Sequence, residues 1–101
     1  MKVIQGKNAN AYYAKEKLMQ YIKLQFADDE LGVQEKNSLE TMLSLLKNLE
    51  PLQDNCYHLS EKEIKIFEDD GHCLRYAINI LQLNRWDILN ENEQYILVPP
   101  I

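Results

Sequence analysis

The chain has 101 residues and a formal net charge of −5; 46% of its residues are apolar, and glycine and proline contribute three residues each. This composition excludes a disordered tail, and the length predicts one folded domain over residues 1–101. No run approaches the roughly 20 apolar residues of a membrane-spanning helix, and the first residues lack the apolar stretch of a secretory signal. We therefore expect a cytoplasmic protein without a membrane partner, in which Cys56 and Cys73 are reduced thiols.

The first half of the chain predicts two helices. Apolar residues at a spacing of three to four predict a helix over residues 10–27, with Lys15 away from the apolar face. An acidic turn over residues 28–32 follows. Asn37 and Glu40 have the spacing of a capping box and predict the start of a second, leucine-rich helix that Pro51 ends. Residues 52–59 are expected to form a loop with a short extended piece at 56–58.

The second half predicts two further helices and a β-hairpin. Ser60 and Glu63 repeat the capping-box spacing, so we expect a short helix over residues 61–69 and a turn at Asp70-Gly71. Residues 61–80 can also be interpreted as a β-hairpin around that turn. The helical spacing further along favours a helix over residues 72–84, with these residues buried: Leu74, Ala77, Ile78 and Leu81. Residues 86–89 and 95–98 then predict two strands around a polar turn.

The order of these elements resembles a winged helix-turn-helix domain over residues 38–98. The stretch "LSEKEIKIFEDDGHCLRYAINILQLNRWDILNENEQYILVPP" carries the resemblance: a capped short helix, a glycine turn, a helix and a hairpin. It implies a mainly α fold with a small C-terminal β-hairpin. A winged-helix-like core would span residues 37–101, with an N-terminal helix and turn at 10–36. In such domains the 72–84 helix is the recognition helix and residues 90–93 form the wing tip.

The same resemblance identifies a candidate partner-binding surface. It consists of the face of the 72–84 helix opposite the predicted buried side, together with the wing tip: His72, Arg75, Tyr76, Asn79, Ile80, Gln82, Leu83, Glu91 and Glu93. Arg75 and Asn79 are residue types that read guanine and adenine edges. The tyrosine, isoleucine and leucine in the set are more typical of a protein interface.

The distribution of charge favours a protein partner over DNA. Residues 1–59 contain seven basic and eight acidic residues, whereas residues 60–101 contain four basic and eight acidic residues. DNA binding normally needs several Lys or Arg residues on phosphates, and only Arg75 and Arg85 follow Lys65. The main hypothesis is therefore a small acidic protein that binds a protein partner stoichiometrically, as an inhibitor, adaptor or immunity protein.

Two alternatives remain open. One is a dimeric winged-helix transcription regulator that binds duplex DNA and pairs through the N-terminal helix, as the additional helix does in many relatives of such domains. The residues for that homodimer contact would be Tyr12, Tyr13 and Tyr21, although these rings can also pack on the leucine-rich helix of their own chain. The other alternative is a structural subunit of a larger assembly.

No cofactor, metal site or catalytic site is expected. Cys56, His58, His72 and Cys73 are zinc-ligand types, but their spacing matches no zinc finger. The acidic runs at 28–30 and 68–70 lack the alternating oxygen ligands of a calcium loop. The chain has no phosphate-binding glycine loop, nucleophile elbow or HExxH motif, so we expect a protein that is not an enzyme.

Overall fold

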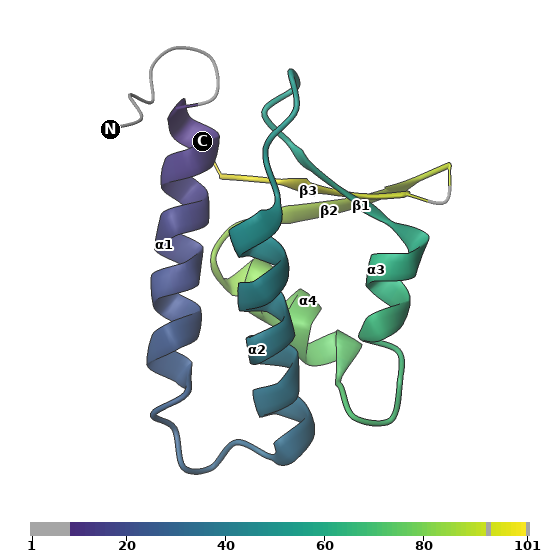
Figure 1. Cartoon of the computed structure of the whole chain (residues 1–101). Coiled ribbons are helices and arrows are strands. Elements are labelled where there is room, and N and C mark those ends of the chain that lie inside the picture. The colour runs from purple at the N-terminus through teal and green to yellow at the C-terminus, as the bar shows by residue number, and fades with distance from the viewer. Residues whose placement is uncertain (1–8, 93, 101) are drawn as a thin grey trace.

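The computed structural model describes residues 9–92 and 94–100, and within these ranges it contains four helices and one three-stranded antiparallel sheet (Figure 1). The elements follow the chain in the order α1 (Ala9–Gln25), α2 (Val33–Asn48), β1 (Tyr57–Ser60), α3 (Glu61–Ile66), α4 (Leu74–Leu83), β2 (Asp87–Glu91) and β3 (Gln94–Val98). Helices α1 and α2 lie side by side, and in Figure 1 the sheet lies above α3 and α4 and level with the upper part of α1. In the described part of the chain, no helix is long and apolar enough to cross a membrane.

The sheet has one strand more than the predicted hairpin. Its order is β1-β3-β2, with Tyr57 opposite Leu97 on one side of β3 and Ile88 opposite Leu97 on the other. The extended piece expected at 56–58 is the start of β1, which joins the hairpin from a distant part of the sequence. Strand β1 has only four residues, of which Tyr57 and Leu59 point inward. So short an alternation of buried and exposed residues does not predict which other strand it pairs with.

Helix α2 begins about one turn earlier than the sequence predicted. The carboxylate of Glu35 accepts a hydrogen bond from the backbone N–H of Gly32 over 3.3 Å and so satisfies a donor at the helix start. The predicted cap, Asn37, lies inside the helix, where its amide donates to the carbonyl of Gly71 over 2.9 Å. The predicted capping box at Asn37 and Glu40 is therefore wrong, because the Asn37 side chain serves a tertiary contact.

Residues 61–83 form two helices, so the helical interpretation is confirmed and the alternative β-hairpin is wrong. The Ser60 and Glu63 capping box is present: Ser60 Oγ accepts from the Glu63 N–H, and the Glu63 carboxylate accepts from the Ser60 N–H. Helix α3 ends at Ile66, earlier than the predicted residue 69. Helix α4 ends at Leu83, and the positive φ of 67° at Arg85 turns the chain into β2.

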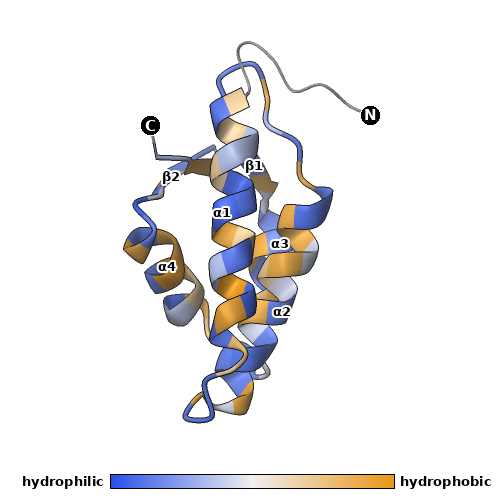
Figure 2. Ribbon diagram, turned by 90° about the vertical axis from the view of Figure 1, so that its left-hand side faces the viewer, coloured by the Kyte–Doolittle hydropathy of each residue, from blue (hydrophilic) through white to orange (hydrophobic). Residues whose placement is uncertain are grey.

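A single apolar core joins the helices to the inner face of the sheet. Trp86 and Tyr57 are its largest fully buried side chains, and their ring centroids lie 5.6 Å apart. The Tyr57 hydroxyl donates to the carbonyl of Ala11 over 2.7 Å and so fastens β1 to α1. Burial raises the pKa of this hydroxyl, which keeps it protonated as the donor. Figure 2 shows that α4 is the most hydrophobic of the long helices, as expected of an element packed between α2 and β2.

Lys15 is buried, although the helical spacing predicted it away from the apolar face. Its exposed fraction is 7%, and its Nζ donates to the carbonyl of Leu49 over 2.8 Å. The ammonium also lies 5.5 Å from the ring centroid of Tyr12 and 5.8 Å from that of Tyr57. A cation at the last carbonyls of α2 complements the negative end of the helix dipole. The lysine therefore links α1 to the end of α2.

Candidate functional site

The exposed face of α4 carries four of the predicted partner-binding residues. Arg75, Asn79 and Gln82 are exposed, and their spacing of four and three residues places them in one row along the helix. Leu83, beside this row, has an exposed fraction of 67%. The structure therefore leaves these four side chains accessible to a partner.

Three other residues of the predicted surface are less accessible than expected. Ile80 belongs to the core with an exposed fraction of 2%, so its predicted place on the partner surface is wrong. Tyr76 and His72 are half-buried. Burial also raises the pKa of Tyr76, and the nearby Glu35 carboxylate adds to the effect. The sequence could not fix the rotation of this helix, because apolar residues occur around most of α4 and its buried side depends on where α2 and β2 lie.

A row of polar side chains on α2 holds the turn between α3 and α4. Gln34 donates to the carbonyl of Asp70 over 2.6 Å, and Asn37 donates to that of Gly71. Ser38 is fully buried; its Oγ donates to the Cys73 carbonyl over 3.3 Å and accepts from the Cys73 N–H over 2.7 Å. These contacts fix the start of α4 relative to α2, and with it the direction in which the exposed face points.

His72 completes this contact between α2 and the turn. Its Nε2 lies 2.8 Å from the Thr41 hydroxyl, and its Nδ1 lies 2.9 Å from Oδ1 of Asp69. A hydroxyl, an imidazole and a carboxylate in this order also make up catalytic triads. Such a triad needs donors that converge on the oxyanion, and the nearby amide of Asn37 is occupied by Gly71. We interpret the chain of contacts as a structural link.

We expect the link between Asp69 and His72 to make stability depend on pH in the acid range. The hydrogen bond from His72 lowers the pKa of Asp69 below its ordinary value of 3.8, and the N–H of Gly71 adds to this. A carboxylate with a lowered folded-state pKa stabilises the fold above its unfolded-state pKa, and this contribution is lost as pH falls through the folded-state value. Urea unfolding between about pH 6 and pH 2 should therefore show a weaker pH dependence for Asp69→Asn than for the wild type. Asp70→Asn is the matched control, and an equal change in both variants would contradict the role of His72.

The two acidic turns predicted from the sequence meet at one end of the molecule. Gln34, just after the first turn, contacts Asp70 in the second, and both turns lie at the bottom of Figure 1. We call this region the acidic end and define it by its exposed carboxylates: Asp28, Asp29, Glu30, Glu68 and Asp70. Within residues 9–92 and 94–100, none of these five forms an ion pair.

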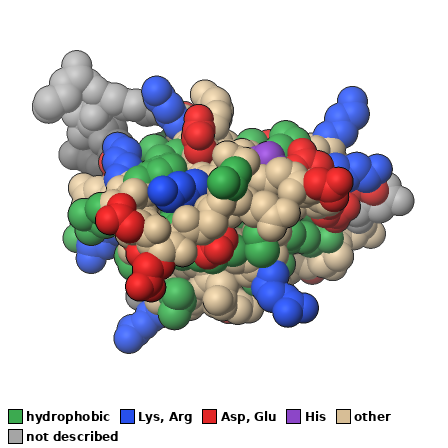
Figure 3. Space-filling model, turned by 90° about the horizontal axis from the view of Figure 1, so that it is seen from below, with side chains coloured by type: hydrophobic (Ala, Val, Ile, Leu, Met, Phe, Trp, Pro, Cys, Tyr) green, Lys and Arg blue, Asp and Glu red, His purple; other side chains and the backbone are tan. Residues whose placement is uncertain are grey.

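The acidic end also exposes apolar side chains. Leu24, near the end of α1, has an exposed fraction of 71%, and Val33, at the start of α2, has one of 76%. Lys23 and Lys36 are the basic residues of the same helix ends. Figure 3, the view from below, shows acidic, basic and hydrophobic side chains interspersed on this face. Residues 28–30 and 68–70 are about 40 positions apart, so the sequence alone gave no sign that they lie at the same end of the molecule.

The turn between β2 and β3, the predicted wing tip, contributes little charge to the described surface. Glu91 at the end of β2 is exposed, as are its neighbours Asn90 and Asn92. Asn92 has a positive φ of 49°, as expected of an asparagine in a tight turn. Glu93, also predicted to contact a partner, lies outside the described residues.

Of the three tyrosines predicted to form a dimer contact, two contact other residues of their own chain and one is exposed. Tyr21 packs against the core, and the hydroxyl of half-buried Tyr12 donates to the carboxylate of Glu50. This bond raises the pKa of the Tyr12 hydroxyl. Tyr13 is exposed, and the Nζ of Lys17 lies 4.8 Å from its ring centroid. Tyr13 is thus the one of the three whose side chain mostly faces outward.

The four candidate zinc ligands do not converge. His58 bonds to Asp54 over 2.8 Å, whereas His72 bonds to Thr41 and Asp69. In the part of the chain that the structure describes, no group of three or more His, Cys, Asp or Glu side chains could hold a metal ion. Burial, followed by the charge of Asp54, raises the pKa of the Cys56 thiol, which disfavours the thiolate that binds metals.

Comparison of the chain with protein-family models, with curated proteins and with solved structures found no match. The acidic end and the exposed face of α4 are therefore the features from which a function can be inferred.

Proposed function

We propose that this chain is a small acidic binding protein that acts stoichiometrically on a protein partner with a basic surface. The contact would be made by the acidic end and by the exposed residues of α4 that begin beside it. One observation carries this proposal: two acidic turns from distant parts of the sequence lie at the same end of the molecule, where Gln34 bonds to the carbonyl of Asp70, and their exposed carboxylates form no ion pair within the described residues. Inhibitor, adaptor and immunity proteins are the classes that work in this way.

The proposal includes a winged-helix-like core formed by α2 to β3, with α1 as an addition. It is supported by the succession α2, α3, turn, α4 and by the antiparallel β2-β3 hairpin that follows α4. Under this interpretation α4 is the recognition helix and the β2-β3 turn is the wing. Such an architecture serves many functions, so the choice of partner depends on the surface rather than on the fold.

Electrostatics favour a basic protein surface over duplex DNA as the partner. The start of α4 lies next to Glu68 and Asp70, which would repel phosphates. A cationic protein surface would instead be attracted, and complementary charges accelerate association and exclude wrong partners. If that surface is one that normally binds nucleic acid, the carboxylates would occupy the positions of phosphates. Leu24, Val33 and Leu83 would supply apolar contacts beside the charged groups.

Capture with matched charge variants tests the proposal. The immobilised chain is incubated with a cell lysate, and retained proteins are eluted with salt or with added duplex DNA. We expect basic proteins to be retained and to be released by the duplex. The variant Asp29→Asn/Asp70→Asn should retain them about tenfold less well, which corresponds to roughly 1.4 kcal/mol. The control Glu16→Gln/Glu40→Gln removes the same charge from exposed positions on α1 and α2 and should retain them as the wild type does.

Two results would contradict the proposal. Equal losses in both variants would mean that net charge, and not the acidic end, determines retention. Direct binding of the chain to a labelled random duplex at about 50 mM salt, lost at about 200 mM, would favour the transcription-regulator alternative. In that case Arg75, Asn79 and Gln82 become the candidates for base contacts.

A further inference from the structure

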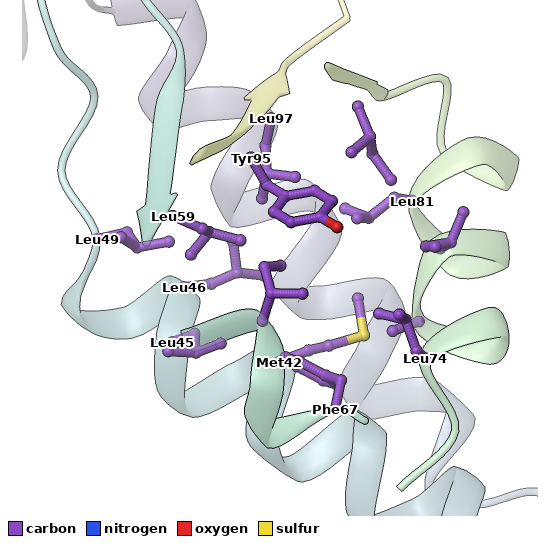
Figure 4. A pocket seen from close by; sticks show the side chains of 14 residues that line it. Met42, Leu45, Leu46, Leu49, Leu59, Phe67, Leu74, Leu81, Tyr95 and Leu97 are labelled. Atoms are coloured by element: carbon purple, nitrogen blue, oxygen red, sulfur yellow. The ribbon is translucent and has the colours of Figure 1, made fainter. Parts of the chain in front are cut away.

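An apolar cavity lies between α2, α3, α4 and the inner face of the sheet. Its volume is about 60 Å³, and no polar atom contributes to its lining surface. Figure 4 shows side chains from all of these elements directed toward the same space. Its walls include Leu46, Leu59, Phe67, Ala77, Leu81 and Leu97.

The cavity is connected to the surface of the protein. Leu74, Ile78 and Tyr95 also line it, and they are half-buried rather than buried. Because these side chains are partly exposed, a molecule could enter the cavity past them. Protein interiors are closely packed, so a space of this size that extends from the surface into the core is large enough to be a candidate site.

The chemistry of the walls determines what can occupy the cavity. An ordered water needs two or more polar partners, which this lining does not provide. A charged or strongly polar molecule would lose its hydration without compensation. A compact apolar molecule loses nothing of this kind and gains contacts with the surrounding leucine, isoleucine and phenylalanine side chains.

We propose that this cavity is a binding site for a small uncharged apolar molecule, an aliphatic group of about one to three carbon atoms, because an aromatic ring needs a cavity of about 150 Å³. The ligand would bridge α3 and α4. Helix α3 packs on β1 and β3, whereas α4 packs on α2 and β2, and both line the cavity. Occupancy would therefore stabilise the position of α4. This proposal does not depend on the identity of the protein partner.

Titration of the wild-type chain with dissolved ethane tests the site, with methanol as the polar probe of similar size. Ethane should raise the melting temperature, shift the methyl NMR signals of Leu46, Ile78 and Leu97, and give nuclear Overhauser contacts to them; methanol should bind at least about tenfold more weakly. Ala77→Met fills the cavity and should weaken ethane binding by about tenfold or more. Ala27→Met, at an exposed position after α1, is the matched control and should bind ethane like the wild type.

A second variant keeps the test independent of how Ala77→Met folds. Ile78→Phe enlarges a half-buried wall residue and should also weaken ethane binding. The absence of ethane contacts to the cavity methyls in the folded wild-type chain would overturn the proposal. Equal binding of ethane and methanol, or unchanged ethane binding in a folded Ile78→Phe chain, would do so as well.

Discussion

Replacing Trp86 by alanine is expected to lower the free energy of unfolding by about 3 to 5 kcal/mol, the usual cost of truncating a large buried aromatic residue. Trp86 has an exposed fraction of 2%, and its ring packs on Tyr57 of β1. Its backbone N–H donates to the carbonyl of Leu81 over 2.9 Å, so the residue stands where α4 leads into the hairpin. Its truncation would leave a cavity between the helices and the sheet.

A loss of this size is a large fraction of the stability of a small domain, which is typically about 5 to 15 kcal/mol. Urea unfolding followed by circular dichroism measures it, because Trp86 is the only tryptophan and its fluorescence is lost with the substitution. Leu83→Ala is the control at an exposed site and should change stability by less than about 0.5 kcal/mol. A cost below about 1 kcal/mol for Trp86→Ala would contradict the central position of the ring.

Replacing Ser38 by alanine is expected to cost about 1 to 3 kcal/mol and to loosen the start of α4. The Ser38 hydroxyl accepts the N–H of Cys73, and no other partner for this N–H is found among the described residues. The Cys73 carbonyl, in contrast, keeps its hydrogen bond from Ala77. The variant therefore leaves one donor unsatisfied in a part of the interior where Ser38 itself is fully buried.

Hydrogen exchange distinguishes a local effect from a global one. In Ser38→Ala we expect the amides at the start of α4 to exchange faster than those of α1. Ser44→Ala, on the exposed side of the same helix, is the matched control and should leave both stability and exchange nearly unchanged. Uniformly faster exchange over the whole chain would show that Ser38 does not hold α4 specifically.

Local patterns predicted most of the secondary structure, because the interactions that form it lie within a few residues. The Ser60 and Glu63 capping box and the helical spacing of Ala77 and Leu81 are examples. The errors have a common cause in long-range contacts. Asn37 has the sequence context of a cap, but its amide bonds to Gly71, 34 positions away. Lys15 has the context of a surface residue, but it bonds to the carbonyl of Leu49.

The candidate site was predictable only in part, for the same reason. Arg75, Asn79, Gln82 and Leu83 are exposed as expected, whereas Ile80 is buried because α2 and β2 determine which side of α4 faces inward. The acidic character of each turn follows from its own residues.

By itself, the sequence determined the helical segments, the β-hairpin, the net charge and the identity of the charged turns, since each depends on neighbours along the chain. Tertiary structure alone decided three features: the third strand, the assembly of the acidic end and the apolar cavity. Each of these requires residues tens of positions apart to approach one another. Such an approach depends on how whole elements pack, and no local pattern of residues encodes it.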